Sequence, residues 1–588
     1  MTGAEYIARF LAETGCDQVS VLTGGACAFM VDAVARQPGM SYACYLHEQA
    51  AAMAADVRWR IDGKPGVAMA TSGPGATNLI TGIACSYFDS IPSLHLTGQV
   101  NQREIGAYGT AKPRQSGFQE TRIVEMVRPI TKYAVMARST DELRQGLATA
   151  YGTAMTGRRG PVLIDVPMDV QQSDAGTTLD LPVRSASDSE TPLAVAEALS
   201  ATLANARRPI VLWGAGIGLA GAVNAVCDWL ARTGLPFVAS WAGMSAFDHD
   251  HANYVGPIGV YGNRGANFAL QNADAVIVLG SRLDNRQRSG NPRNFAIGAA
   301  VHVIDVDPEE LRKYHSDGYR TSLLDFAWLA EVLAATVVPA PNEAWSSYVR
   351  EMKDRYFGRE RSTSAIRLNT LSPYDVVRRM NEVIERDAIV VGDTGAAVCW
   401  LYQAFKVKRH RLVSAGGNSP MGYALPAAIG AKLAAPARQV IAYNGDGGFQ
   451  LNIQELQTLK HLDLDLAIVV MNNCGYGIIR QFQDSYLGGR YHASRDGYSA
   501  PDFGCVAQAY GFGYSKVERL EQITPALFNG KGPSLLEVVL GPDTLIEPKL
   551  EMGRPINDQF PYLPDDEYAA ANRFVAYPRP GALHRVMS

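Results

Sequence analysis

The stretch "VIAYNGDGGFQLNIQELQTLKHLDLDLAIVVMNNCGYG", residues 440–477, decides the fold of this chain. Its two apolar runs have the length and composition of buried strands, and the segment between them has apolar residues at helical spacing. Gly-Asp-Gly-Gly follows the first run and Asn-Asn-Cys-Gly follows the second. In a parallel sheet both clusters lie at one edge, where ligands bind beside helix N-termini that favour anions. We therefore expect both clusters to contact one charged ligand.

The same alternation of short apolar runs and helical patterns extends over most of the chain, which indicates an α/β fold with parallel sheets flanked by helices. A length of 588 residues favours several domains, at roughly 100–200 residues each. A polar linker near residues 171–192 and a charged connection before residue 370 divide the chain. The predicted units are residues 1–170, 190–340 and 370–550, followed by an irregular, Pro-rich tail over 551–588.

The bulk composition excludes several classes of function. The chain is 47% hydrophobic and 19% charged, with a formal net charge of -4, which argues against disorder and against nucleic acid or a membrane surface as partner. We expect a soluble, cytoplasmic protein, because the start is not signal-like and no apolar run is long enough to span a bilayer. The 8 cysteines have no metal-ligand spacing, which predicts reduced thiols.

The polar clusters of the opening stretch contain the oxygen ligands of a candidate metal site. Asp446 supplies a carboxylate and Asn473 an amide oxygen, and glycine-rich backbone leaves a carbonyl free. Such oxygens suit Mg²⁺, which takes its remaining ligands from phosphates and water. Taken alone, Gly-Asp-Gly also fits an ordinary turn that caps a helix.

Gly-Asp-Gly followed about 25 residues later by Asn-Asn resembles the signature of thiamine-diphosphate enzymes. This resemblance implies that Asp446, Asn473 and the carbonyl of Gly475 hold Mg²⁺ against the cofactor diphosphate. It also implies that the glycines let the backbone approach that diphosphate; these are Gly445, Gly447 and Gly448.

Two further motifs, "HEQAAAMAA" (47–55) and "TSGPGATN" (71–78), are similar to the acetolactate synthase branch of this family. The similarity implies that Glu48 hydrogen-bonds the aminopyrimidine ring of the cofactor and so promotes its activation. It also places Asn78 among the cofactor-binding residues. The family order of domains is then pyrimidine-binding, central FAD-type and diphosphate-binding.

Other segments extend the resemblance over nearly the whole chain. "SAGGNSPMGYALPAAIGAK" (414–432) implies that Met421 wedges between the cofactor rings and that the carbonyl of Ser419 accepts from the pyrimidine amino group. "GDTGAAVCW" (392–400) adds Thr394 and Gly395 to the cofactor site. The resemblance also implies catalytic positions beside the reacting carbon, which are Phe118 and Gln119 in "SGFQETR" and Gly25 in "TGGA".

The central unit resembles an FAD-binding domain. "LWGAGIGLAG" (212–221) is like a dinucleotide fingerprint, but the next strand, "LPFVAS", ends without the acid that would bind an NAD ribose. The better match is to the middle domain of acetolactate synthases, where FAD is bound but not needed for net redox chemistry. That match makes Arg282 and Arg286 candidates for flavin contact.

The resemblance predicts a carboligase that decarboxylates pyruvate or a similar 2-oxo acid and transfers the two-carbon unit to a carbonyl acceptor. It further predicts a homodimer or homotetramer with active sites between subunits. Glu48 would then serve a cofactor held by the metal site of the partner subunit.

Three departures from acetolactate synthases leave the acceptor open. Phe482 stands where a Trp favours 2-oxobutyrate, and Ala396 and Ala397 replace a Gln-His pair. The loop over 101–120 is longer and more basic; it adds Arg103, Lys112 and Arg114. These features resemble enzymes that transfer an acetyl unit from pyruvate to a nucleotide-linked keto-sugar. A lyase or hydrolase of a 2-hydroxyketone or cyclic diketone is a third reading, and a non-catalytic, cofactor-binding subunit is an alternative of another class.

Overall fold

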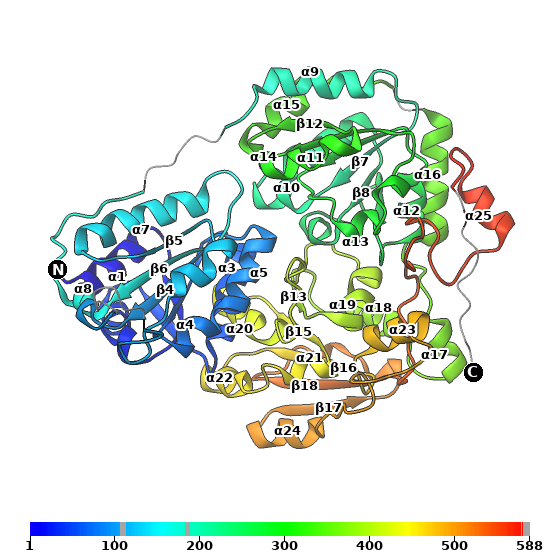
Figure 1. Cartoon of the computed structure of the whole chain (residues 1–588). Coiled ribbons are helices and arrows are strands. Elements are labelled where there is room, and N and C mark those ends of the chain that lie inside the picture. Colours follow the sequence, from blue (N-terminus) through cyan, green and yellow to red (C-terminus); the bar gives the residue numbers. More distant parts are fainter. Residues whose placement is uncertain (106–112, 183–187, 341, 578, 580–588) are drawn as a thin grey trace.

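The computed structural model describes residues 1–105, 113–182, 188–340, 342–577 and 579. Within them the chain forms three parallel sheets of six strands each, one in each third of the sequence (Figure 1). Helices cover both faces of these sheets, so most strand residues are buried. The α/β fold predicted from the sequence is confirmed. We name the three parts after their sheets: the N-terminal, central and C-terminal units.

The N-terminal unit has the strand order β2-β1-β3-β4-β6-β5. Its strands are β1 (Gln18–Leu22), β2 (Ser41–Cys44), β3 (Gly66–Ala70), β4 (Ser93–Gln99), β5 (Tyr133–Met136) and β6 (Val162–Pro167). Its helices are α1 (Gly3–Glu13), α2 (Ala28–Arg36), α3 (Glu48–Asp62), α4 (Pro74–Asn78), α5 (Ile80–Asp89), α6 (Ile123–Val127), α7 (Thr140–Met155) and α8 (Met168–Gln172).

The central unit has the order β12-β11-β10-β7-β8-β9. The strands β7 to β9 extend the sheet on one side of the parallel pair β7 and β10, and the strands β10 to β12 extend it on the other. Its strands are β7 (Pro209–Trp213), β8 (Phe237–Ala239), β9 (Tyr254–Pro257), β10 (Ala275–Leu279), β11 (Ala300–Asp305) and β12 (Arg320–Leu323). Its helices are α9 (Pro192–Leu203), α10 (Ala215–Leu219), α11 (Val223–Thr233), η4 (Trp241–Ala246), α12 (Arg264–Gln271), α13 (Asn285–Arg288), α14 (Pro308–Arg312), α15 (Leu329–Ala335) and α16 (Glu343–Tyr356).

The C-terminal unit has the order β14-β13-β15-β16-β18-β17. Its strands are β13 (Ile389–Gly392), β14 (Arg411–Val413), β15 (Val440–Gly445), β16 (Ala467–Asn472), β17 (Gly513–Val517) and β18 (Ser534–Val539). Its helices are α17 (Thr363–Leu368), α18 (Pro373–Val383), α19 (Gly395–Ala404), α20 (Ala424–Ala434), α21 (Asp446–Gln450), α22 (Glu455–His461), α23 (Gly477–Tyr486) and α24 (Phe503–Tyr510).

The opening stretch folds as strand, helix and strand, as predicted, because β15 and β16 are parallel neighbours with Gly445 opposite Met471. The intervening helix differs in one respect. It is divided into α21 and α22, and α21 begins at Asp446, directly after β15. The aspartate therefore lies at the start of a helix as well as at the end of a strand.

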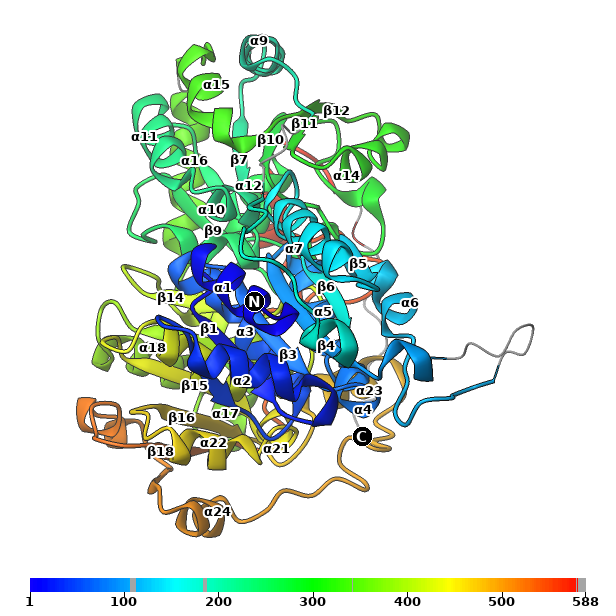
Figure 2. The same cartoon turned by 90° about the vertical axis from the view of Figure 1, so that its left-hand side faces the viewer.

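The N-terminal and C-terminal units pack through α3 and α20, two helices rich in alanine. A Cβ on Gly430 would lie 2.6 Å from the carbonyl oxygen of Ala54, so the two backbones approach closely. Beside this contact the buried carboxylate of Asp56 accepts from the hydroxyl of Tyr423 at 2.5 Å and pairs with Arg60 at 3.2 Å. Figure 2 shows the N-terminal unit in front, with the central unit above it and the C-terminal unit below.

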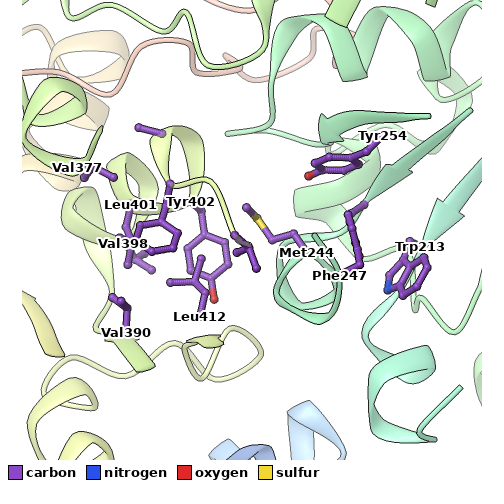
Figure 3. Close-up of a cluster of buried hydrophobic side chains, with 14 of the residues drawn as sticks. Trp213, Met244, Phe247, Tyr254, Val377, Val390, Val398, Leu401, Tyr402 and Leu412 are labelled. Atoms are coloured by element: carbon purple, nitrogen blue, oxygen red, sulfur yellow. The ribbon is translucent and has the colours of Figure 1, made fainter. Parts of the chain in front are cut away.

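The central and C-terminal units share one hydrophobic core (Figure 3). Met244 of η4 and Phe247 lie between Trp213 of the central sheet and Tyr402 of α19. The segment predicted as an irregular tail contains one further helix, α25 (Asp565–Ala571), which packs against the central unit beside α12 and α16.

Candidate functional site

A pocket of about 640 Å³ opens at the carboxyl end of the C-terminal sheet, between this unit and the central one. It contains every residue that the sequence assigned to the diphosphate-binding half of the site. These residues are Thr394, Gly395, Ser419, Met421, Gly445, Asp446, Gly447, Gly448, Asn473 and Gly475. The two polar clusters of the opening stretch therefore do meet in space.

Three oxygen atoms converge at the bottom of this pocket. The side-chain oxygen of Asn473 lies 3.0 Å from the carbonyl oxygen of Gly475 and 3.2 Å from Oδ1 of Asp446. Octahedral Mg²⁺, with bonds of about 2.0–2.1 Å, separates adjacent ligand oxygens by about 2.9 Å. The donor set and its spacing therefore fit Mg²⁺.

The amide of Asn473 has a second favourable orientation. Turned by 180°, its nitrogen would donate to the same two oxygens, and its oxygen would accept from Arg480 at 3.1 Å. An inward nitrogen would satisfy these two oxygens without a cation, whereas an inward oxygen would require a cation between the three oxygens. Arg480 also donates to the backbone carbonyl of Asn473 at 2.9 Å, which fixes this residue in both states.

Asp446 is held rigidly and is almost fully buried, with 1% of its surface exposed. Its Oδ2 accepts from the amide of Gly475 at 2.9 Å and from the hydroxyl of Tyr498 at 2.7 Å. Burial raises the pKa of this carboxyl group. A bound divalent cation would offset that cost by favouring the charged form.

Three helix N-termini face the same pocket, because the first residues of α19, α21 and α23 all line it. Exposed amide groups and the positive end of the helix dipole attract anions. A diphosphate placed here would contact both these amides and a cation at Asp446.

Two glycines keep this part of the pocket open. A Cβ on Gly447 would lie 2.4 Å from the ring of Tyr476. A Cβ on Gly448 would lie 1.7 Å from Oδ2 of Asp393, so neither position tolerates a side chain as the structure stands. Oδ2 of Asp393 is buried and has no hydrogen-bond partner among the described residues, and burial raises the pKa of this carboxyl group to about 6.

The residues predicted to shape the cofactor, Ser419 and Met421, line the same pocket. Ser419 has a φ of 52°, and its hydroxyl is 2.5 Å from that of Thr394. Met421 reaches toward the diphosphate side, since its Cε would be 3.4 Å from a Cβ on Gly447.

The remaining predicted residues gather at the carboxyl end of the N-terminal sheet. Glu48 begins α3, is 6% exposed, and accepts from Asn78 at 2.9 Å. A Cβ on Gly75 would lie 3.2 Å from Oε1 of Glu48, so the absence of a side chain at this glycine leaves room beside the carboxyl group.

Two loops complete the N-terminal cluster. Gln119 has a φ of 65° and packs over Gly73. The loop with Gly25 rests on Thr71, whose hydroxyl accepts from the amide of Ala26 at 3.2 Å. Phe118 is 84% exposed, which is unusual for so large an apolar side chain.

The two clusters do not form one site within a single chain. Neither Glu48 nor any of the other N-terminal cluster residues is among those that line the 640 Å³ pocket; these others are Asn78, Gly25, Gln119 and Phe118. Each cluster presents half of the expected residues. Phe118 is exposed, and Gly75 leaves room beside the carboxyl group of the buried Glu48, so the N-terminal half has a surface that lacks a counterpart in the described chain.

The structure separates the two arginines predicted to contact a flavin. Arg286 lines the pocket together with Trp241 and Tyr261. Arg282 does not, because it donates to the carbonyl of Phe88 at 2.7 Å.

The glycine-rich turn after β7 is closed by the loop after β10. The amides of Gly214 and Gly216 donate to the carbonyls of Leu279 and Gly280, at 2.9 and 3.0 Å. The two glycine amides are therefore not free to bind a pyrophosphate, which agrees with the interpretation that this turn is not an NAD fingerprint.

The residues at which the sequence departs from the acetolactate synthase pattern lie in two parts of the structure. Ala396, Ala397 and Phe482 all line the pocket. Arg103 and Arg114 are exposed, and Lys112 lies outside the described residues.

Sequence reasoning missed several residues of the site. Tyr498 and Arg480 hydrogen-bond to the candidate metal ligands Asp446 and Asn473, and no sequence motif indicated either of them. Asp393 belongs to the quoted "GDTG". Its position, as an acid between a strand and a helix, could have indicated it as a residue of the site. Lys549 and Met552 reach the pocket from the last part of the chain.

Three further features concern metal clusters, membrane helices and cysteines. In the part of the chain that the structure describes, no group of three or more His, Cys, Asp or Glu side chains has metal-binding geometry. No helix in the same ranges has the length and apolar character needed to cross a membrane. None of the 8 cysteines, all of which lie in the described ranges, forms a disulfide in the structure.

Comparison with known protein families assigns all three units. Residues 1–126 match the N-terminal TPP binding domain of thiamine pyrophosphate enzymes, residues 196–321 match the central domain, and residues 393–538 match the C-terminal TPP binding domain. The residues that line the 640 Å³ pocket in the C-terminal unit and the N-terminal cluster thus lie in two different TPP binding domains.

Curated relatives cover nearly the whole chain. Acetolactate synthase isozyme 2 large subunit of Escherichia coli K12 is 34% identical over 548 residues, 92% of this chain and 95% of the relative. The acetolactate synthase large subunit of Lactococcus lactis is 33% identical over 560 residues, 94% of this chain and 95% of the relative. A probable acetolactate synthase large subunit of Methanocaldococcus jannaschii is 33% identical over 568 residues, 92% of each. The chain therefore belongs to the thiamine pyrophosphate-dependent enzymes of the acetolactate synthase type.

Proposed function

We propose that this enzyme uses thiamine diphosphate and Mg²⁺ to decarboxylate pyruvate, or a similar 2-oxo acid, and joins the two-carbon unit to a carbonyl acceptor. The observation that supports this most directly is the triad of oxygens from Asp446, Asn473 and Gly475, which lies beneath three helix N-termini. Relatives that share the full length are acetolactate synthases.

Thiamine diphosphate, when bound, supplies a carbanion nucleophile and an electron sink. The residues of this chain bind and orient it. Asp446, Asn473 and the carbonyl of Gly475 would hold Mg²⁺, and the amides that begin α19, α21 and α23 would face the diphosphate. Met421 and Ser419, which line the same pocket, would contact the organic rings.

Glu48 would hold a proton at the aminopyrimidine ring. Its partner Asn78 fixes the position of the carboxyl group, and Gly75 leaves room beside it. Gln119 and Phe118 would contact the substrate, and the loop with Gly25 would cover it.

We further propose a homodimer or homotetramer in which the N-terminal cluster of one chain meets the pocket of another. The separation of the two clusters within one chain supports this arrangement. Each site would combine Asp446 of one chain with Glu48 of the partner subunit.

FAD is the third proposed cofactor. Arg286, Trp241 and Tyr261 form an aromatic and cationic end of the pocket, next to the proposed thiamine site. Arg282 would contribute only after releasing the carbonyl of Phe88. Release of a yellow chromophore on denaturation of the purified protein would test this proposal.

The second candidate reaction is acetyl transfer from pyruvate to a nucleotide-linked keto-sugar or another ketone. Ala396 and Ala397 favour it, because small side chains at the start of α19 leave space in the pocket for a larger acceptor. A lyase or hydrolase of a 2-hydroxyketone or cyclic diketone is third.

The test is CO₂ release from pyruvate in the presence of thiamine diphosphate, Mg²⁺ and FAD, with products identified by mass spectrometry. Abundant acetolactate from pyruvate alone supports acetolactate synthesis. Slow release that an added keto-sugar nucleotide accelerates supports acetyl transfer. If cofactor binds but no CO₂ is released, the pyruvate donor is wrong.

A further inference from the structure

A second pocket, of about 390 Å³, lies between the central and C-terminal units and shares no lining residue with the cofactor pocket. One wall consists of Ser245, Ala246 and Phe247, at the end of η4. The other residues come from the C-terminal unit and are mostly cationic; they are Asp387, Lys408, Arg409, His410, Arg411 and Arg438.

The positive charge of this second pocket is poorly balanced. Lys408 pairs with Asp250 at 3.3 Å. Among the described residues, no carboxylate forms a salt bridge with Arg409, Arg411 or Arg438. Arg438 instead donates to the backbone carbonyl of Asp387 at 2.7 Å. Several guanidinium groups therefore face one cavity and leave donors for a further anion.

His410 provides a second observation, which concerns the hydrogen bonding of its ring. Its side chain is buried, with 4% of the residue exposed, and it packs edge-on against Phe405. Nδ1 accepts from the amide of Lys408 at 3.3 Å, so the neutral ring carries its hydrogen on Nε2. Nε2 lies toward the backbone carbonyl of Glu385 but makes no hydrogen bond of normal geometry with it or with another described residue. Buried donors are normally paired, and this one belongs to a residue that lines the pocket.

We propose that this second pocket is a binding site for a phosphoryl group, carried by a phosphate ester or by inorganic phosphate. Guanidinium groups match the oxygens of such a dianion, and an imidazole N–H supplies a further donor. Ala246 and Phe247 offer an apolar wall for the organic part of an ester. No step of the proposed reaction uses these residues.

The second pocket is connected to the cofactor pocket by a single short helix. Trp241, at the first turn of η4, lines the cofactor pocket and stacks on Tyr402 with ring centroids 5.0 Å apart. Ala246, at the end of η4, lines the second pocket. Met244 and Phe247 anchor the helix and its exit in the shared core (Figure 3). A ligand in the second pocket would thus contact the helix that forms part of the cofactor pocket wall.

Binding can be tested by calorimetric titration of the holoenzyme with inorganic phosphate and with ribose 5-phosphate. Thiamine diphosphate and Mg²⁺ are kept saturating, so that the diphosphate site is filled, and chloride at equal ionic strength serves as the salt control. The variants are R411Q/R438Q and R409Q/R411Q. The second variant changes only exposed side chains, which protects the test against loss of folding. R207Q/R232Q, which removes two exposed arginines of the central unit, is the charge-matched control.

We expect saturable binding to wild type and to the control, and binding weaker by about tenfold or more in both pocket variants. Tighter binding of ribose 5-phosphate would identify an ester as the ligand class, and equal binding would identify inorganic phosphate. Absence of saturable binding, or equal affinity in all four proteins, would overturn the proposal.

Discussion

Replacing Asp446 by Asn allows the effect of this residue on the stability of the apoprotein to be measured separately from its effect on cofactor binding. Oδ2 accepts two hydrogen bonds, from Gly475 and Tyr498, which an amide oxygen can also accept. The new N–H would lie where Oδ1 is now, 3.2 Å from the side-chain oxygen of Asn473. The substitution removes a buried charge, and the hydrogen bond that the inward-turned nitrogen of Asn473 can donate to Oδ1 is replaced by one of the opposite direction. The free energy of unfolding of the apoprotein should therefore rise by about 1–2 kcal/mol from loss of the buried charge alone.

The same substitution should abolish most Mg²⁺-dependent cofactor binding. Loss of an outer-shell partner weakens metal sites by about 10–100-fold, and Asp446 is the only charged ligand proposed, so we expect about 100-fold or more. At cofactor concentrations well above the dissociation constant, a 100-fold loss removes about 2.7 kcal/mol of ligand-induced stabilisation.

Both effects can be measured in one experiment, by thermal and urea unfolding with and without thiamine diphosphate and Mg²⁺. Asp228→Asn, at an exposed position on α11, is the matched control and should change neither quantity. A clearly less stable D446N apoprotein that keeps its cofactor-induced stabilisation would refute the assignment of Asp446 as a metal ligand.

Three further outcomes follow from the geometry. Glu48→Gln should lower CO₂ release by about 100-fold or more while cofactor affinity stays within about tenfold; unchanged release would instead fit a non-catalytic subunit. Gly447→Ala places a Cβ 2.4 Å from the Tyr476 ring and should weaken cofactor binding in calorimetry by about tenfold or more; unchanged affinity would show that the ring can move away freely. Burial raises the pKa of Asp165 from 3.8 to about 7. Between these two pH values the folded chain binds more protons at Asp165 than the unfolded chain does, so the free energy of unfolding falls as pH rises, by up to about 4 kcal/mol. Asp165→Asn should remove that slope in urea unfolding at pH 4–8, and an unchanged slope would contradict this.

The sequence alone was sufficient to predict that polar residues directly after neighbouring strands lie close together. Asp446 and Asn473 converge because the carboxyl ends of neighbouring parallel strands must meet, whatever the loops do. Met421 and Ser419 were found by resemblance alone, since no periodicity marks a residue with a φ of 52°.

The residues that support the metal site could not be predicted in this way. Tyr498 reaches Asp446 from a loop, where sequence patterns constrain the path of the chain only weakly. The tail posed the same difficulty. Its Pro-rich composition predicts irregular backbone, yet Ile556 is buried in the core of the central unit, and Met552 lines the pocket.

Activity of mixed subunits tests the central claim most directly, namely that one chain supplies Asp446 and another supplies Glu48. D446N and E48Q chains, each inactive alone, are co-expressed with different tags, and CO₂ release from pyruvate is measured for the purified mixed assembly. A mixed dimer contains one site with both native residues and one with neither, so we expect about half the wild-type activity per dimer. A mixed assembly as inactive as its parents would show that both residues act within one chain, and the proposed intersubunit site would be wrong.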